Sequence, residues 1–127
     1  QGLRGEPITV YGDGNQTRCF AHVKDVVGAL VKLISAREAR GQIFNVGNSE
    51  EVSIRQLAER VRDLTGRGSE LVFVPYEEAY GEGFDDMRRR VPDLRKVHEL
   101  IGYKPSHDLN DILRDVIEYE KALPGEA

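Results

Sequence analysis

The chain has 127 residues, enough for one domain with a core of its own but short for the usual two-domain enzyme. Its composition of 39% hydrophobic and 31% charged residues is that of a folded globular protein and argues against extended disorder or a membrane span. The formal net charge of -4 provides no global attraction for nucleic acid, and a single cysteine, Cys19, excludes an internal disulfide and fits a reducing compartment.

The first elements predicted along the chain form a β-hairpin. The run ITVY, residues 8–11, is β-branched and aromatic, and GDGN, residues 12–15, supplies turn residues. The run RCFAHV, residues 18–23, is apolar enough to return as a second strand. The hairpin would turn at Asp13-Gly14, where glycine tolerates a positive φ.

A helix and a strand are expected next. Asp25 is a candidate N-cap because apolar residues follow it at helical spacing, and Gly41 is expected to end the helix. The run QIFNVGN, residues 42–48, is nearly continuous in apolar residues. It predicts a buried strand, parallel to a neighbour, since a helix precedes it and another follows.

The clearest helix start lies at Ser53, which forms a predicted capping box with Gln56 and precedes an apolar stripe that ends at Gly66. Residues 70–75, ELVFVP, predict another strand. Residues 76–87, YEEAYGEGFDDM, are polar and without periodicity, which predicts an irregular loop of the length that often carries function.

Two helices close the chain. Asp93 is expected to cap a short helix that Gly102 ends, and an amphipathic helix is expected over about 108–123. The pattern of hairpin, helix, strand, helix, strand, loop and two helices predicts an α/β fold with a small, partly parallel sheet. So few strands would leave a sheet edge that needs cover.

Two features around the predicted turn suggest anion binding. The run GDGNQ, residues 12–16, lacks both the third glycine of a dinucleotide loop and the Gly-Lys-Ser/Thr of a P-loop, so its role as a turn is favoured. Arg18, on the predicted second strand, carries a planar set of donors that suits a phosphate. A surface salt bridge explains Arg18 equally well from residue type alone.

The basic run Arg88, Arg89 and Arg90 is a second candidate anion site. Acidic neighbours offer the alternative that the run is neutralised by pairing, the candidates being Glu77, Glu78, Glu82, Asp85 and Asp86. The three histidines have no metal-ligand spacing with Cys19 or with one another, so no metal site is predicted. Ser106, His107 and Asp108 are adjacent in sequence and are therefore not expected to form a catalytic triad.

Three separated segments resemble one enzyme family in the same order. They are PITVYGDGNQTRCFAHVKDVVGAL, QIFNVGN and MRRRVPDLRKVHELIGYKP. Together they resemble the C-terminal half of the extended short-chain dehydrogenase/reductases, specifically the NAD-dependent nucleotide-sugar epimerases, dehydratases and decarboxylases, with UDP-glucuronate decarboxylase-like members closest. The resemblance covers almost the whole chain and implies that residues 1–127 are a C-terminal, nucleotide-sugar-binding domain of a Rossmann-type protein.

The resemblance also implies which residues bind the substrate. The backbone from Pro7 to Tyr11 matches the segment that meets the pyrimidine, and Gln16 and Arg18 match the pair near the ribose and the diphosphate. Asn45 matches the asparagine of the Y/F-N-x-G strand. Arg90 matches an arginine placed near the diphosphate or the sugar, although the preceding GEGFDD departs from the family's R-x-G-D or R-P-G-H segment, so that Arg88 or Arg89 is an alternative.

Two features that the family needs for chemistry are not in this sequence. The family's Rossmann domain has a glycine-rich dinucleotide loop and a Tyr-x-x-x-Lys pair, and none of the five tyrosines here is followed four residues later by lysine. We therefore expect a fragment, with NAD bound by the parent and no cofactor, metal or catalytic residue in this piece, which alone would be inactive.

For the parent, the resemblance implies a cytoplasmic homodimer that uses a nucleotide sugar, expected to be a UDP-sugar, and neither nucleic acid nor membrane. The fragment is expected to self-associate. The reaction remains open between epimerisation, dehydration and decarboxylation. The alternative from another class is a binding or interaction module without enzymatic activity.

Overall fold

The computed structural model describes residues 1–84 and 86–123, and the chain divides into two compact units. Unit 1 combines Gln1–Arg18, Val52–Arg90 and the last segment, from Leu113 onward. Unit 2 combines Cys19–Glu51 and Val91–Ile112. Each unit is therefore built from segments that are far apart in the sequence.

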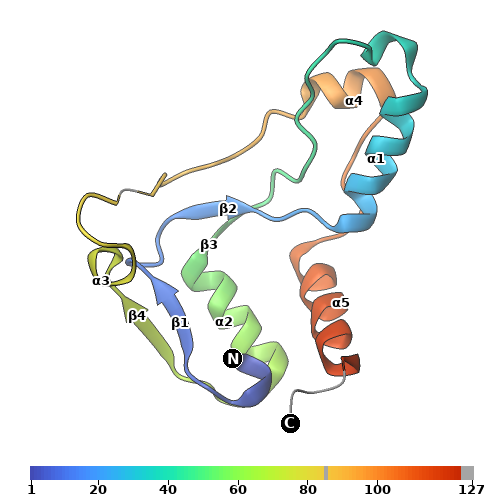
Figure 1. The fold of residues 1–127 in the computed structure, drawn as a ribbon. Coiled ribbons are helices and arrows are strands. Elements are labelled where there is room, and N and C mark those ends of the chain that lie inside the picture. Colours follow the sequence, from blue (N-terminus) through green and yellow to red (C-terminus); the bar gives the residue numbers. More distant parts are fainter. Residues whose placement is uncertain (85, 124–127) are drawn as a thin grey trace. The chain divides into compact units, whose positions relative to one another are not determined.

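The chain combines helices with short strands, and its last three elements are helices (Figure 1). This confirms the predicted α/β class with a small, partly parallel sheet. In order, the elements are η1 (Gly2–Arg4), β1 (Ile8–Tyr11), β2 (Thr17–Cys19), α1 (Val23–Ser35), η2 (Arg37–Ala39), β3 (Glu51–Ser53), α2 (Ile54–Thr65), β4 (Leu71–Val74), α3 (Tyr76–Tyr80), α4 (Arg95–Ile101) and α5 (Leu109–Ala122).

Unit 1 is organised around the parallel pair of strands β1 and β4, which lie side by side in Figure 1. Their register runs from Ile8 opposite Leu71 to Tyr11 opposite Val74. The inward residues of β1 are buried with Ala58 of α2, as expected when alternate residues of a strand face a helix. The two strands therefore end at the same edge of the sheet.

The predicted hairpin between β1 and the following strand is wrong, because β1 pairs with β4 and β2 pairs with β3. The turn after β1 does not fold back along the sheet. Instead its carbonyl groups accept hydrogen bonds from the start of α2, Gly14 O from Arg55 N at 2.9 Å and Gln16 O from Ile54 N at 3.1 Å. These bonds satisfy backbone donors that the first turn of a helix leaves open.

The capping box predicted at the start of α2 is confirmed. Ser53 Oγ accepts from Gln56 N at 3.1 Å, and Gln56 Oε1 accepts from Ser53 N at 3.0 Å. The predicted end is also confirmed, since Gly66 follows the helix with a left-handed φ of 65°. Local sequence signals therefore fix both ends of this helix.

Substituting Ser53 by alanine should lower the free energy of unfolding by about 1 kcal/mol, because Gln56 N loses its acceptor. Urea denaturation followed by circular dichroism measures this change. Thr65→Ala near the other end of α2 serves as a comparison, since the Thr65 hydroxyl only donates to carbonyls already engaged in the helix. Unchanged stability in Ser53→Ala would mean that the capping box contributes nothing.

Unit 2 packs α1 and α4 around a small apolar core of Ala29, Val97 and Tyr103. The predicted strand at 42–48 is wrong, because these residues pair with none of the described strands. Ile43 is 88% exposed, whereas Phe44 packs against the core. The segment has the apolar side chains of a strand but no neighbouring strand to supply the ladder.

Helix α1 begins three residues earlier than predicted. His22 is the N-cap, and its Nδ1 accepts from Lys24 N at 3.1 Å. Asp25, the predicted cap, instead accepts hydrogen bonds from the segment after α4. Its donors are Ser106 N (3.0 Å), Ser106 Oγ (2.6 Å) and His107 N (3.1 Å), and His107 Nδ1 lies 3.0 Å from Oδ1. Asp25 thus joins two parts of unit 2.

Two smaller predictions also need correction. Residues 76–80 of the predicted loop form the short helix α3, while Asp85 lies outside the described residues. Helix α4 begins at Arg95 with Leu94 as its N-cap. The predicted cap, Asp93, precedes the N-cap by one residue, and its Oδ1 still accepts a hydrogen bond from Arg95 N at 3.0 Å. The predicted stop at Gly102 is confirmed by its φ of 66°.

Candidate anion-binding site

The candidate site lies in unit 1, at the edge where β1 and β4 end. Because the two strands are parallel and Tyr11 is opposite Val74, the residues that follow each strand meet at this edge. The turn 12–16 comes from β1, and α3 comes from β4. Ligands of open α/β sheets bind at the carboxyl ends of the strands, so this is the edge where binding residues are expected.

Gly12 allows these two segments to approach closely. It has a φ of 74°, and a Cβ atom at this position would lie 2.6 Å from the ring of Tyr76. Both facts require glycine, first for the backbone conformation and second for space. Gly12 N also donates to Val74 O at 2.8 Å, which ties the turn to the end of β4.

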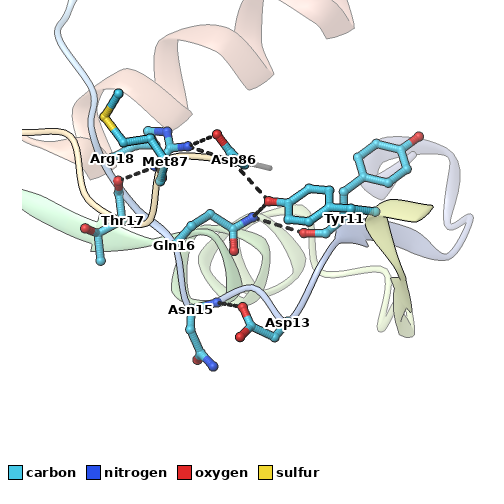
Figure 2. Close-up of polar contacts among 9 residues, drawn as sticks. Tyr11, Asp13, Asn15, Gln16, Thr17, Arg18, Asp86 and Met87 are labelled. Atoms are coloured by element: carbon cyan, nitrogen blue, oxygen red, sulfur yellow. Dashed lines mark hydrogen bonds and ion pairs between the residues drawn. The ribbon is translucent and has the colours of Figure 1, made fainter. Parts of the chain in front are cut away.

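A chain of hydrogen bonds runs through the site (Figure 2). Gln16 Nε2 donates to Tyr11 O at 3.0 Å and to Tyr76 Oη at 2.7 Å, and Tyr76 Oη donates to Asp86 Oδ2 at 3.0 Å. Gln16 is only 5% exposed. Burial, and next the hydrogen bond to Asp86, raise the pKa of the Tyr76 hydroxyl, which therefore stays protonated and donates at neutral pH.

Arg18 stands at the end of this chain of contacts. Its Nη2 lies 2.6 Å from each oxygen of the Asp86 carboxylate, and its Nη1 donates to Thr17 O at 2.7 Å and Met87 O at 2.8 Å (Figure 2). The side chains of Arg18 and Asp86 are 20% and 30% exposed. The structure therefore shows the ion pair that residue type allowed, at the position where the resemblance implies a phosphate ligand.

Arg88 forms a second ion pair beside the first. Its Nη1 donates to Asp13 Oδ2 at 2.7 Å. Two hydrogen bonds lower the pKa of Asp13 to about 2, the larger contribution coming from Arg88 and the next from Asn15 N. Arg88 and Asp13 belong to the lining of a cavity of about 170 Å³, which comprises Gly12, Asp13, Gln16, Tyr76, Asp86 and Arg88.

Arg18 is not part of this cavity lining, although its ion-pair partner Asp86 is, and the remaining predicted residues also lie outside it. Pro7 is exposed at the start of β1, and Tyr11 is 43% exposed at its end. Arg90 is exposed and closes the second segment of unit 1. Asn45 belongs to unit 2, where its Nδ2 lies 3.4 Å from Asp93 O. Unit 1 thus brings Gln16 and Arg18 together with the segment that contains the arginine run.

Sequence reasoning missed Tyr76 and the specific role of Asp86. Both belong to the stretch that was predicted as an irregular loop. The available signal was the position of Tyr76 just after the predicted strand 70–75, at the carboxyl edge of the parallel pair, where open α/β sheets bind ligands. Asp86 was one of five acidic candidates for pairing with the run Arg88–Arg90, but its carboxylate contacts Arg18 instead, and Arg88 pairs with Asp13.

A metal-binding cluster and a membrane-spanning helix are both absent from the residues that the structure describes. In residues 1–84 and 86–123, His, Cys, Asp and Glu side chains form no group of three that could hold a metal ion. No helix within these residues combines the length and apolar character needed to cross a bilayer.

Comparisons with known proteins agree on one family. The family model described as GDP-mannose 4,6 dehydratase matches residues 2–116. UDP-N-acetyl-alpha-D-glucosaminuronate decarboxylase of Bacillus cytotoxicus is 34% identical over 124 residues, which cover 98% of this chain and 38% of the relative. UDP-glucuronic acid decarboxylase 1 of Xenopus tropicalis is 40% identical over 119 residues, covering 94% of this chain and 26% of the relative.

Solved structures give the same result. UDP-glucuronic acid 4-epimerase from Bacillus cereus, in complex with UDP-glucuronic acid and NAD, superposes with a TM-score of 0.82 at 26% identity. The match covers 96% of this chain and 37% of the epimerase. The chain thus spans roughly a quarter to two fifths of the length of the proteins it matches.

Proposed function

Because the chain belongs to the GDP-mannose 4,6-dehydratase family of extended short-chain dehydrogenase/reductases, we propose that it is the nucleotide-sugar-binding part of an NAD-dependent enzyme. The observation that carries the proposal is the ion pair of Arg18 with Asp86, a residue of the cavity beyond the carboxyl ends of the parallel pair. A guanidinium group there offers the planar donors that a diphosphate accepts.

We assign roles to six residues on the basis of the family pattern. The backbone between Pro7 and Tyr11 would meet the nucleobase, and Gln16 and Arg18 the ribose and diphosphate. Asn45 and Arg90 would complete the contacts to the sugar and the diphosphate, with Arg88 or Arg89 as alternatives to Arg90. The ligand is proposed to be a UDP-sugar, since the two decarboxylase relatives and the epimerase named above are enzymes of UDP-sugars.

NAD does not fit the residues of this chain. The GDG run is not followed by a third glycine at the spacing of a dinucleotide loop, and the sequence has no Tyr-x-x-x-Lys pair. It therefore offers neither the phosphate loop nor the proton-transfer pair of the family. We propose that the NAD-binding domain and the catalytic groups lie elsewhere in the complete protein, and that this chain is inactive alone. We further propose that the complete protein is a cytoplasmic homodimer.

The reaction has two candidates. Epimerisation or dehydration is the first, in keeping with the family model and with the superposed epimerase. Decarboxylation is the second, and it is favoured by the two relatives described above, both named as decarboxylases of UDP-linked uronic acids. In either reaction this chain would supply substrate binding, and groups outside it would supply the chemistry.

Calorimetric titration tests the proposal directly. We expect the complete protein to bind both NAD and UDP-glucuronic acid, and this 127-residue chain to show no saturable binding of NAD at millimolar concentration, because it lacks the dinucleotide loop. Binding of NAD to this chain near one equivalent would overturn the division of roles. Absence of UDP-sugar binding by the complete protein would overturn the assigned substrate class.

A further inference from the structure

Asp86 blocks every edge through which Arg18 could hold a phosphate by two parallel bonds. A guanidinium group has two such edges, Nη1 with Nη2 and Nε with Nη2, so both include Nη2. In this structure both oxygens of Asp86 lie 2.6 Å from Nη2. Among the described residues Arg18 Nε has no acceptor, and a single N–H cannot replace the bidentate arrangement.

We propose that Asp86 is a specificity-determining residue, a carboxylate that a ligand's phosphate must displace from Arg18. The inference rests on the proposed function, since it concerns the same arginine. A ligand with a diphosphate carries enough charge to compete with one carboxylate for Nη2. A ligand without an anionic group leaves the ion pair intact and gains nothing from Arg18.

The exchange needs only one side chain to move. The segment after Asp86 is held to the segment around Thr17 by its backbone, with Thr17 N donating to Arg88 O at 2.8 Å and a bridge from Thr17 to Arg89. Arg18 Nη1 keeps its bonds to carbonyl groups. None of these contacts involves the Asp86 carboxylate, so they persist when it turns away.

The neighbouring Tyr76 adjusts to the same exchange. When Asp86 leaves, Tyr76 Oη loses its acceptor at 3.0 Å but keeps the hydrogen bond that it accepts from Gln16 Nε2 at 2.7 Å. Its hydroxyl proton is then available to the incoming phosphate, which is a strong acceptor. The displaced carboxylate is already 30% exposed and can be solvated.

The test uses the complete protein and measures the dissociation constants of UDP and of uridine by calorimetry. Asp86→Asn keeps the shape of the side chain but removes its charge, so UDP should bind about fivefold to twentyfold more tightly while uridine binding is unchanged. Glu78→Gln is the matched control, because it makes the same change of charge on α3, at an exposed residue with no contact to Arg18. It should alter UDP binding by less than about twofold.

Arg18→Ala and the double variant Arg18→Ala with Asp86→Asn separate the possible failures. If Arg18→Ala weakens UDP binding but Asp86→Asn weakens it or leaves it unchanged, the displacement is wrong while the proposed function stands. If the tightening persists in the double variant, it does not act through Arg18, and the inference is overturned. If Arg18→Ala leaves UDP binding unchanged, the proposed role of this arginine fails, and the inference fails with it. Asp86→Ala provides a second variant with no hydrogen-bonding group.

Discussion

Substitution of Arg18 by alanine in the complete protein should raise the dissociation constant for its UDP-sugar by about 10-fold to about 150-fold. A hydrogen bond to a charged group contributes about 1.5 to 3 kcal/mol, which corresponds to this range. Because the diphosphate is the same in the ground state and the transition state, the loss should appear in substrate binding more than in turnover. Calorimetric titration and steady-state kinetics measure the two effects.

A lysine at this position tests the geometry of the contact. Arg18→Lys keeps the charge but loses the planar donors, so it should also weaken binding, by less than the alanine variant. The affinity for NAD should remain unchanged in both variants. Weakened NAD binding with normal UDP-sugar binding would place Arg18 elsewhere in the complete protein. Unchanged affinity for both ligands would leave the ion pair with Asp86 as its entire role.

Substitution of Asp25 by alanine should lower the free energy of unfolding by about 2 to 4 kcal/mol. The Asp25 side chain is only 7% exposed, and it accepts hydrogen bonds from Ser106 N, Ser106 Oγ and His107 N. Without the carboxylate, two backbone donors lose their partner. Urea denaturation measures the loss, and Asp63→Asn, at a side chain 70% exposed, should change stability by less than about 0.5 kcal/mol.

The Asp25 carboxylate should also make the free energy of unfolding depend on pH in the acidic range. Burial alone would raise the pKa of Asp25, but hydrogen bonds from Ser106 and His107 outweigh it and lower the pKa to about 2 from the usual 3.8. A depressed pKa stabilises the fold at pH values above 3.8, and this contribution of about 2 kcal/mol is lost as the pH falls towards 2. Asp25→Asn should remove that part of the pH dependence. An unchanged acid profile in this variant would show that other carboxylates govern it.

Local signals in the sequence predicted local structure well. The capping box at Ser53 and the glycine after α2 involve residues within a few positions of one another, so pattern alone located both ends of the helix. The hairpin and the strand at 42–48 depended on a partner strand elsewhere in the chain. An apolar, β-branched pattern shows that a segment can form a strand, but it does not identify the strand with which it pairs. In the structure β1 pairs with β4 and not with the strand next in sequence.

Of the candidate site, only the residues within one local motif could be predicted, because contacts between distant parts of the chain leave no local signal. Arg18 and Gln16 stood out because one resembled a phosphate ligand and the other lay two residues away in the same motif. Asp86 contacts Arg18 across a long separation in sequence, and only the parallel pairing that brings α3 beside the turn 12–16 reveals it. Whether those residues bind a nucleotide sugar stays a prediction, tested by the variants above.

The parallel pairing of β1 with β4 also has a consequence for folding during synthesis. Ile8 leaves the ribosome long before Leu71, its neighbour in the ladder, so the ITVY run has no sheet partner until α2 and β4 have been made. Closing so long a loop costs chain entropy before any contact compensates for it. During that interval ITVY is a short, uncharged segment of high β-propensity whose backbone donors and acceptors have no partner strand.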